Sequence, residues 1–132
     1  MSVKEIVRPK GVAKPAGVWS PAVTVVEPKK LVFLSGFAAR DENGDVVCAG
    51  DITGQTEKVC ENLKATVEAA GGTLADIVSV TVFVRDIKQF DAIHAVRRRY
   101  FPQDPPASTM VEVTGLVDER MLIEINAVAA LA

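Results

Sequence analysis

The C-terminal part of the chain alternates apolar and polar residues with a period of two. Residues 111–113 read Val-Glu-Val, and residues 122–126 read Leu-Ile-Glu-Ile-Asn. This alternation is typical of half-buried β-strands. The connection 114–120 contains a glycine and ends in three charged residues, which predicts a solvated turn. We therefore interpret the two strands as a candidate antiparallel hairpin.

Further strands are predicted upstream. Residues 5–7 form a candidate edge strand, and the β-rich runs 23–26 and 30–36 flank Glu27-Pro28-Lys29, which has the chemistry of a hairpin turn. Asn43-Gly44 indicates a tight turn, with 46–48 as a short returning strand. The run 76–84 is the strongest strand, because it is rich in β-branched residues, and we expect it to be central.

In two segments the apolar residues recur with the period of an α-helix. Residues 51–70 repeat apolar side chains every three or four positions, with Asp51 or Thr53 as the N-cap and Gly71-Gly72 as the stop. A second helix is predicted from Asp86 to Phe101, ended by the prolines that follow. The order of elements predicts an α+β domain with both helices on one face of a mixed sheet.

Charged residues in the second helix have an ordinary explanation. Arg97-Arg98-Arg99 lies near the C-terminal end, where positive charge is favourable against the helix dipole, and we prefer this interpretation to an anion site. His94 is expected on the polar face or at an interface. The uncovered sheet face also carries apolar side chains, so we expect a closed homo-oligomer that buries it.

Composition narrows the class of protein. The chain has 132 residues, a net charge of −2 and no basic run, which argues against nucleic acid as a main partner. No apolar stretch approaches the length of a membrane span or a signal peptide, so no membrane partner and a cytoplasmic location are expected. One domain over residues 1–132 suffices for this length.

The sequence gives little indication of a metal site or of a catalytic cysteine. Cys48, Cys60 and His94 lie apart, without ligand spacing, so no metal site is predicted. Cys60 falls in the first helix and is interpreted as a buried small hydrophobe rather than a nucleophile.

Two polar or aromatic positions are candidate site residues. Glu124 is flanked by Ile123 and Ile125, so its carboxylate either faces solvent or is held by hydrogen bonds. Trp19 lies in a predicted loop, where it either covers packed surface or contacts a ligand.

Motifs along nearly the whole chain together resemble the YjgF/RidA family of reactive-intermediate deaminases. Each motif is weak alone, and their order and spacing carry the resemblance. They are Gly17-Val18-Trp19-Ser20-Pro21-Ala22, Leu34-Ser35-Gly36, Ala69-Ala70-Gly71, Asp76-Ile77-Val78, Val80-Thr81-Val82-Phe83-Val84, Tyr100-Phe101, Pro106-Ala107, Val111-Glu112-Val113 and Ile123-Glu124-Ile125.

The resemblance implies a chorismate-mutase-like fold, with a mixed six-stranded sheet, two helices on one face and a homotrimeric barrel with clefts between subunits. Members of this family hydrolyse imines or enamines, such as 2-iminopropanoate and 2-aminoacrylate, without a cofactor. In them an arginine directly after Pro-Ala binds the substrate carboxylate, a glutamate of the last strand positions the attacking water, and a tyrosine of the early loop lines the cleft.

Three of these positions differ here. Ser108 stands at the arginine position, Trp19 at the tyrosine position and Phe37 where a polar residue is common, whereas Glu124 is retained. The resemblance thus assigns Glu124 as the catalytic residue. The expected substrate-binding residues are Ser108, Thr109, Trp19, Ser35 and Phe37.

Serine lacks the charge of the family arginine, and Arg40 or Arg120 is a candidate to replace it. Two functions therefore remain open: a deaminase for a small-molecule substrate larger or less charged than 2-iminopropanoate, and a non-catalytic trimer that binds a metabolite or a partner protein. A nuclease, attached to some relatives, ranks last because the chain has no basic groove, metal ligands or histidine pair.

Overall fold

The computed structural model describes residues 4–132 and contains six strands and two α-helices in that range. The strands are β1 (Lys4–Val7), β2 (Ala22–Val25), β3 (Lys30–Phe37), β4 (Ile77–Val84), β5 (Ala107–Glu112) and β6 (Ile123–Leu131); the α-helices are α1 (Ile52–Ala69) and α2 (Phe90–Tyr100), with short 3-10 helices at Leu74–Asp76 and Ile87–Gln89.

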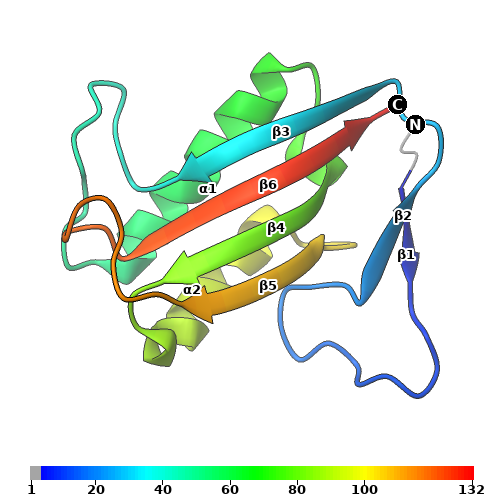
Figure 1. Cartoon of the computed structure of the whole chain (residues 1–132), viewed down its shortest axis with the longest axis horizontal. Coiled ribbons are helices and arrows are strands. Elements are labelled where there is room, and N and C mark those ends of the chain that lie inside the picture. Colours follow the sequence, from blue (N-terminus) through cyan, green and yellow to red (C-terminus); the bar gives the residue numbers. More distant parts are fainter. Residues whose placement is uncertain (1–3) are drawn as a thin grey trace.

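The strands form two sheets instead of the single six-stranded sheet that the resemblance implied. β3, β6, β4 and β5 form a four-stranded sheet in that order, in which β4 and β5 are parallel and the other pairs are antiparallel. β1 and β2 pair with each other and lie beyond one end of the strands of the larger sheet, near the start of β4 and β5 (Figure 1). The expectation of a mixed sheet is confirmed for the larger sheet, and β4 is central in it as predicted.

Both predicted hairpins are wrong. β2 pairs with β1 rather than with β3, and β4 lies between β5 and β6. The returning strand at 46–48 reduces to one bridge between Arg40 and Val46. Alternation of side chains identifies a strand and its buried face, but it holds no information about the partner strand, which tertiary packing decides.

α1 begins at the predicted Asp51 cap, whereas α2 begins at Phe90, four residues after the predicted Asp86 cap, because a short 3-10 helix intervenes. The Asp51 carboxylate accepts a hydrogen bond from the Gly54 backbone N–H at 3.0 Å, and Asp86 accepts one from the Lys88 backbone N–H at 3.0 Å, where it caps the short turn before α2. Each bond satisfies an amide that the helical pattern leaves without a partner. Neither α1 nor α2 is long and apolar enough to cross a membrane.

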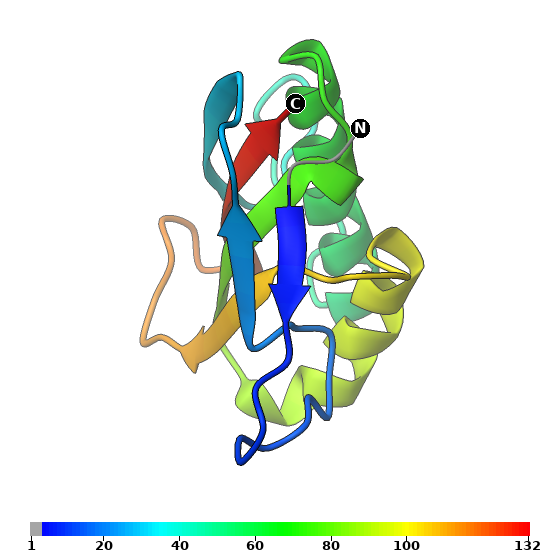
Figure 2. The ribbon, with the colours of Figure 1, turned by 90° about the vertical axis from the view of Figure 1, so that its right-hand side faces the viewer.

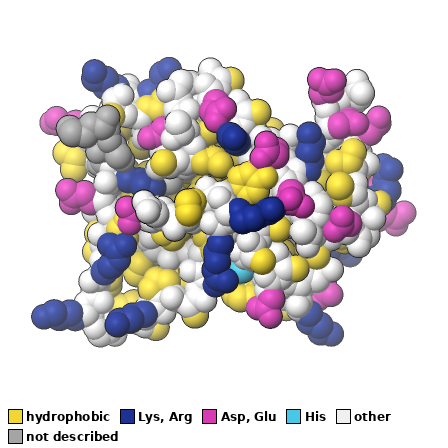
Figure 3. All heavy atoms as spheres, turned by 180° about the vertical axis from the view of Figure 1, so that it is seen from behind, with side chains coloured by type: hydrophobic (Ala, Val, Ile, Leu, Met, Phe, Trp, Pro, Cys, Tyr) yellow, Lys and Arg dark blue, Asp and Glu magenta, His cyan; other side chains and the backbone are white. Residues whose placement is uncertain are grey.

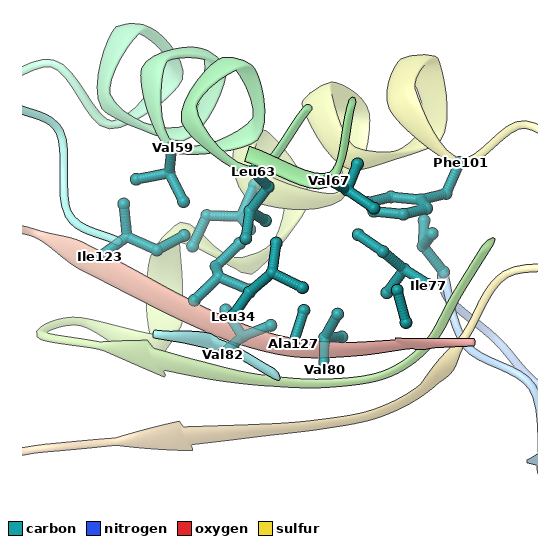
Figure 4. Packing of buried hydrophobic residues seen from close by; sticks show 14 of the residues in the cluster. Leu34, Val59, Leu63, Val67, Ile77, Val80, Val82, Phe101, Ile123 and Ala127 are labelled. Atoms are coloured by element: carbon teal, nitrogen blue, oxygen red, sulfur yellow. The ribbon is translucent and has the colours of Figure 1, made fainter. Parts of the chain in front are cut away.

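The hydrophobic core lies between the helices and one face of the four-stranded sheet. In Figure 4, Val59, Leu63 and Val67 of α1 point toward Val82 and Ala127 of the sheet. The three α1 side chains are fully buried. Burying a side chain of this size contributes about 1.5–3 kcal/mol, so this stripe is the main attachment of α1 to the sheet.

The other face of the sheet is uncovered. Figure 2, seen from the side, places α1 and α2 on the same side of the sheet. The uncovered face carries Leu31, Phe33 and Val111, and Phe33 is 76% exposed. The helix-covered side instead shows acidic and basic side chains interspersed (Figure 3), as expected for a solvated surface. The predicted apolar character of the uncovered face is confirmed.

Candidate active site

Glu124 lies on the uncovered face of the sheet at the start of β6. Its neighbours Ile123 and Ile125 are buried toward the helices, so the alternation of the strand turns the Glu124 side chain away from the core. A Cβ atom at position 36 would overlap the Glu124 carboxylate. The strand register shifts between Leu34 and Phe37, and this irregularity brings Gly36 next to the carboxylate.

A groove of about 660 Å³ opens beside the Glu124 carboxylate. It runs between the end of β3, the loop after it and α1. Its polar and charged lining includes Arg40, Lys58 and Asn62, and Phe37 also contributes. Asp41 and Glu42 line it as well, so the groove places the half-buried Glu124 side chain among groups of both charges.

The two arginines considered as replacements for the family arginine differ in position. Arg40 lines the groove of Glu124. Arg120 binds Asp118 instead, through Nε at 3.0 Å and Nη2 at 2.8 Å. This pair lowers the pKa of the Asp118 carboxyl to about 2, because the hydrogen bonds favour its charged form. Of the two, only Arg40 is placed to act at the Glu124 groove.

A second cluster forms around Arg97 of α2. Arg97 is 1% exposed, and its Nη2 donates to the Ser108 hydroxyl at 3.0 Å and to the Val18 carbonyl at 3.2 Å. Burial lowers the pKa of the guanidinium to about 10, which leaves it charged at neutral pH. The helical period places Val96 or Arg97 on the apolar stripe of this helix, and both are buried, but the helix-dipole interpretation gave Arg97 no role at a site.

The loop that carries Trp19 is fixed against the same region. The Ser20 backbone N–H donates to the Pro106 carbonyl at 3.0 Å, and the Ser20 hydroxyl donates to the Pro105 carbonyl. Trp19 itself is half-buried. These bonds, together with that from Arg97 to the Val18 carbonyl, hold the Trp19 loop beside the start of β5.

His94 is buried rather than on a polar face, which corrects the expectation from the sequence. Its ring stacks on Phe90 at 3.8 Å between centroids, and a Cβ atom at Gly17 would overlap its Nε2. Burial lowers the pKa of the imidazole, favouring the neutral form. His94 thus packs against the base of the Trp19 loop.

Ser108 and Thr109 point to opposite faces of the sheet. Ser108 pairs with buried Val80 and turns toward the helices, whereas Thr109 pairs with Thr81 and is exposed on the uncovered face. Ser35 is exposed at the end of β3, while Phe37 is half-buried and packs against the core. The five expected substrate-binding residues therefore divide between two regions.

Within one chain, Glu124 and Ser108 do not meet. β5 lies two strands from β6, and Ser108 is level with Ala127, three residues along β6 from Glu124. At about 4.8 Å between strands and about 3.4 Å per residue, their Cα atoms are roughly 14 Å apart. The chain thus presents two partial sites, one at Glu124 and one at Ser108 with Trp19.

Cys60 does not add a nucleophile. Cys60 is buried, and burial raises the pKa of its thiol to about 12, so it stays protonated at neutral pH. Cys48 is exposed. Over residues 4–132, no group of three or more His, Cys, Asp or Glu side chains is placed to hold a metal ion.

Comparison with known proteins identifies relatives over nearly the full length. A family model described as endoribonuclease L-PSP matches residues 11–131. The 3-aminoacrylate deaminase RutC of Acinetobacter baylyi is 40% identical over 126 residues, 96% of this chain and 97% of that protein. A solved Rid-family protein of Yersinia pestis has a TM-score of 0.89 and 29% identity, covering 98% of this chain and 99% of that one. RidA of an Antarctic Psychrobacter species has a TM-score of 0.72 and 28% identity, covering 96% and 99%.

The fold is that of a Rid-type α+β protein over nearly the whole chain. The chain belongs to the YjgF/RidA family, as the match over residues 11–131 and the RutC relative show. The resemblance seen in the sequence motifs is thereby confirmed.

Proposed function

We propose that the protein is a deaminase that hydrolyses a small imine or enamine. The observation that carries this proposal is the Glu124 carboxylate, held over Gly36 at the side of an open groove. The 40% identity to a 3-aminoacrylate deaminase favours the same reaction class. The reaction needs no cofactor.

The proposed reaction uses water as the only second reactant. Glu124 accepts a proton from a water molecule while the water oxygen bonds to the carbon of the protonated C=N group. Glu124 then returns that proton to the nitrogen of the carbinolamine, the C–N bond breaks to release ammonia, and the hydroxyl loses its proton to the ammonia, which leaves a carbonyl, an ammonium ion and the free carboxylate. An enamine enters the same route once a proton has been added to its carbon.

The site is completed between subunits of a homotrimer in this proposal. One chain presents Glu124 and Ser108 about 14 Å apart on opposite faces, so a neighbour is needed to bring a second set of groups to the groove. The exposed apolar residues of the uncovered face supply the surface for that association. We expect the activity in the cytoplasm, with a small-molecule substrate.

The alternative is a non-catalytic trimer that binds a metabolite in the same clefts. The replacement of the family arginine by Ser108 favours it, because a neutral hydroxyl anchors a carboxylate less strongly than a guanidinium. This alternative predicts ligand binding without release of ammonia.

Ammonia release tests the proposal. We expect release from 3-aminoacrylate or 2-iminopropanoate generated in situ, and a loss of about 10²–10⁴-fold in Glu124→Gln, which keeps the shape and removes the base. Glu119→Gln, in the exposed loop before β6, is the matched control and should keep full activity. A Glu124→Gln variant with unchanged turnover would refute the assigned role, and a wild type that binds the oxo-acid product without any turnover would favour the alternative.

A further inference from the structure

Arg97 is a buried cation without a counter-charge. Among the residues that the structure describes, no carboxylate lies within ion-pair distance of its guanidinium. Its Nε is buried and has no hydrogen-bond partner. Burying a charge in this state is costly, so the position is poorly explained by stability of the fold alone.

The contact between Arg97 and Ser108 sets the direction of the serine hydroxyl. A guanidinium can only donate, so the Ser108 oxygen accepts from Arg97 Nη2 at 3.0 Å. The single hydroxyl hydrogen must then point away from Arg97. Ser108 is half-buried, and no group among the described residues accepts this hydrogen, which leaves it for a ligand. A hydroxyl that accepts from a cation is also a stronger donor.

The same nitrogen of Arg97 holds the aromatic loop. Nη2 also donates to the Val18 carbonyl at 3.2 Å, directly before Trp19. Arg97 therefore fixes the relative position of the Ser108 hydroxyl and the Trp19 loop, which belong to segments 89 residues apart in the sequence.

We propose that Arg97 is a positioning residue that holds the Ser108 hydroxyl as an oriented, charge-assisted donor for the carboxylate of a small oxo or imino acid. The inference rests on the proposed function for its ligand class. Arg97 does not contact the ligand, because its side chain is only 1% exposed and its guanidinium bonds to the Ser108 hydroxyl instead. The charge that Ser108 lacks is thus supplied from α2.

Binding of a stable product analogue tests this inference independently of turnover. The probes are 2-oxobutanoate and its neutral methyl ester, titrated by calorimetry. Hydrogen bonds to charged groups are among the stronger ones in proteins, so we expect Ser108→Ala and Arg97→Met each to weaken binding of the acid by at least about 10-fold. Binding of the ester should change little. Arg98→Met, an exposed arginine of the same turn, is the control and should match the wild type.

The double variant separates positioning from a purely structural role. If Arg97 acts through Ser108, Ser108→Ala/Arg97→Met should bind the acid no more weakly than the worse single variant. Arg97→Lys should restore part of the preference for the acid. If Arg97→Met does not fold, Arg97→Lys in the Ser108→Ala background answers the same question, because its effect should disappear there.

Three results would overturn the inference. They are an equal loss for acid and ester in Arg97→Met, losses that multiply in the double variant, and a wild type that does not prefer the acid. Failure of the proposed function looks different: it is the absence of ammonia release while the preference for the acid and its dependence on Arg97 remain.

Discussion

The Glu124 carboxylate occupies the space that a side chain at Gly36 would need. Gly36 is at the end of β3, where the register with β6 shifts, and Glu124 is at the start of β6. The absence of a side chain at position 36 therefore decides where the carboxylate lies and how it faces the groove.

Gly36→Ala should displace the carboxylate. We expect a loss of only about 0.5 kcal/mol in the free energy of unfolding, because the carboxylate ends a flexible side chain and can rotate away from the added methyl, together with a fall in kcat for ammonia release. Urea denaturation and the ammonia assay measure the two effects. In the Glu124→Ala background the same substitution should cost much less stability.

Gly115→Ala is the control for the Gly36 substitution. No atom lies within 4 Å of a Cβ built at Gly115, so this variant should match the wild type in stability and activity. If Gly36→Ala were as stable and as active as Gly115→Ala, the carboxylate would not depend on the glycine.

The elements that sequence predicts well are those set by local chemistry. The start of α1 follows from the Asp51 cap, and the core faces of β4 and α1 follow from periodicity. The pairing of β2 with β1 could not be predicted, because both strands satisfy their local patterns with several possible partners. Local signals identify elements, and tertiary contacts arrange them.

The residues of the candidate site also divide into those that the local sequence identifies and those that only tertiary contacts identify. Glu124 stands out in the sequence as a carboxylate in an apolar strand, and the motif around it carries the resemblance. Arg97 does not stand out, since its importance comes from contacts with Val18 and Ser108, which other elements supply. A helical projection alone places Arg97 beside buried Ile93, and this is the only signal that could have indicated its burial.

A charge introduced on the uncovered sheet face should weaken the association of the subunits. Phe33→Lys introduces a cation at the most exposed position of that face, and a like charge on every subunit opposes association. We expect the wild type to be a trimer by light scattering and the variant to shift toward monomer at micromolar concentration. Ile87→Lys, at an exposed apolar residue in the 3-10 helix before α2, is the control and should stay trimeric. A monomeric wild type would contradict the assembly.

The Cys60 thiol should make stability fall at high pH. Its pKa is raised to about 12 in the folded chain by burial, whereas an unfolded thiol titrates near 8.5. A raised folded pKa contributes stability that is complete below about pH 8.5 and is lost as the pH rises toward 12. The slope is about 1.4 kcal/mol per pH unit in that window.

Cys60→Ala removes this titration. Its unfolding free energy should be lower than that of the wild type at pH 7, because a buried side chain is truncated, and should fall less steeply between pH 8.5 and 10.5. Cys48→Ala should keep the wild-type slope, since Cys48 is exposed in both states. Equal slopes for the wild type and Cys60→Ala would show that the Cys60 thiol is not the group responsible.

Restoring the family arginine should require a second change. Arg97 Nη2 lies 3.0 Å from the Ser108 hydroxyl, so an arginine at position 108 places two guanidinium groups side by side with no carboxylate between them. We expect Ser108→Arg to lower the free energy of unfolding by about 1–3 kcal/mol and to gain little activity toward 2-iminopropanoate.

Adding Arg97→Met to Ser108→Arg should recover stability and raise activity, because the new guanidinium is then free to reach the ligand. Ala95→Arg, at an exposed position of α2, is the control and should leave stability within about 0.5 kcal/mol of the wild type. Full stability and activity in Ser108→Arg alone would mean that the arginine at 108 turns away from Arg97 and that the two positions act independently.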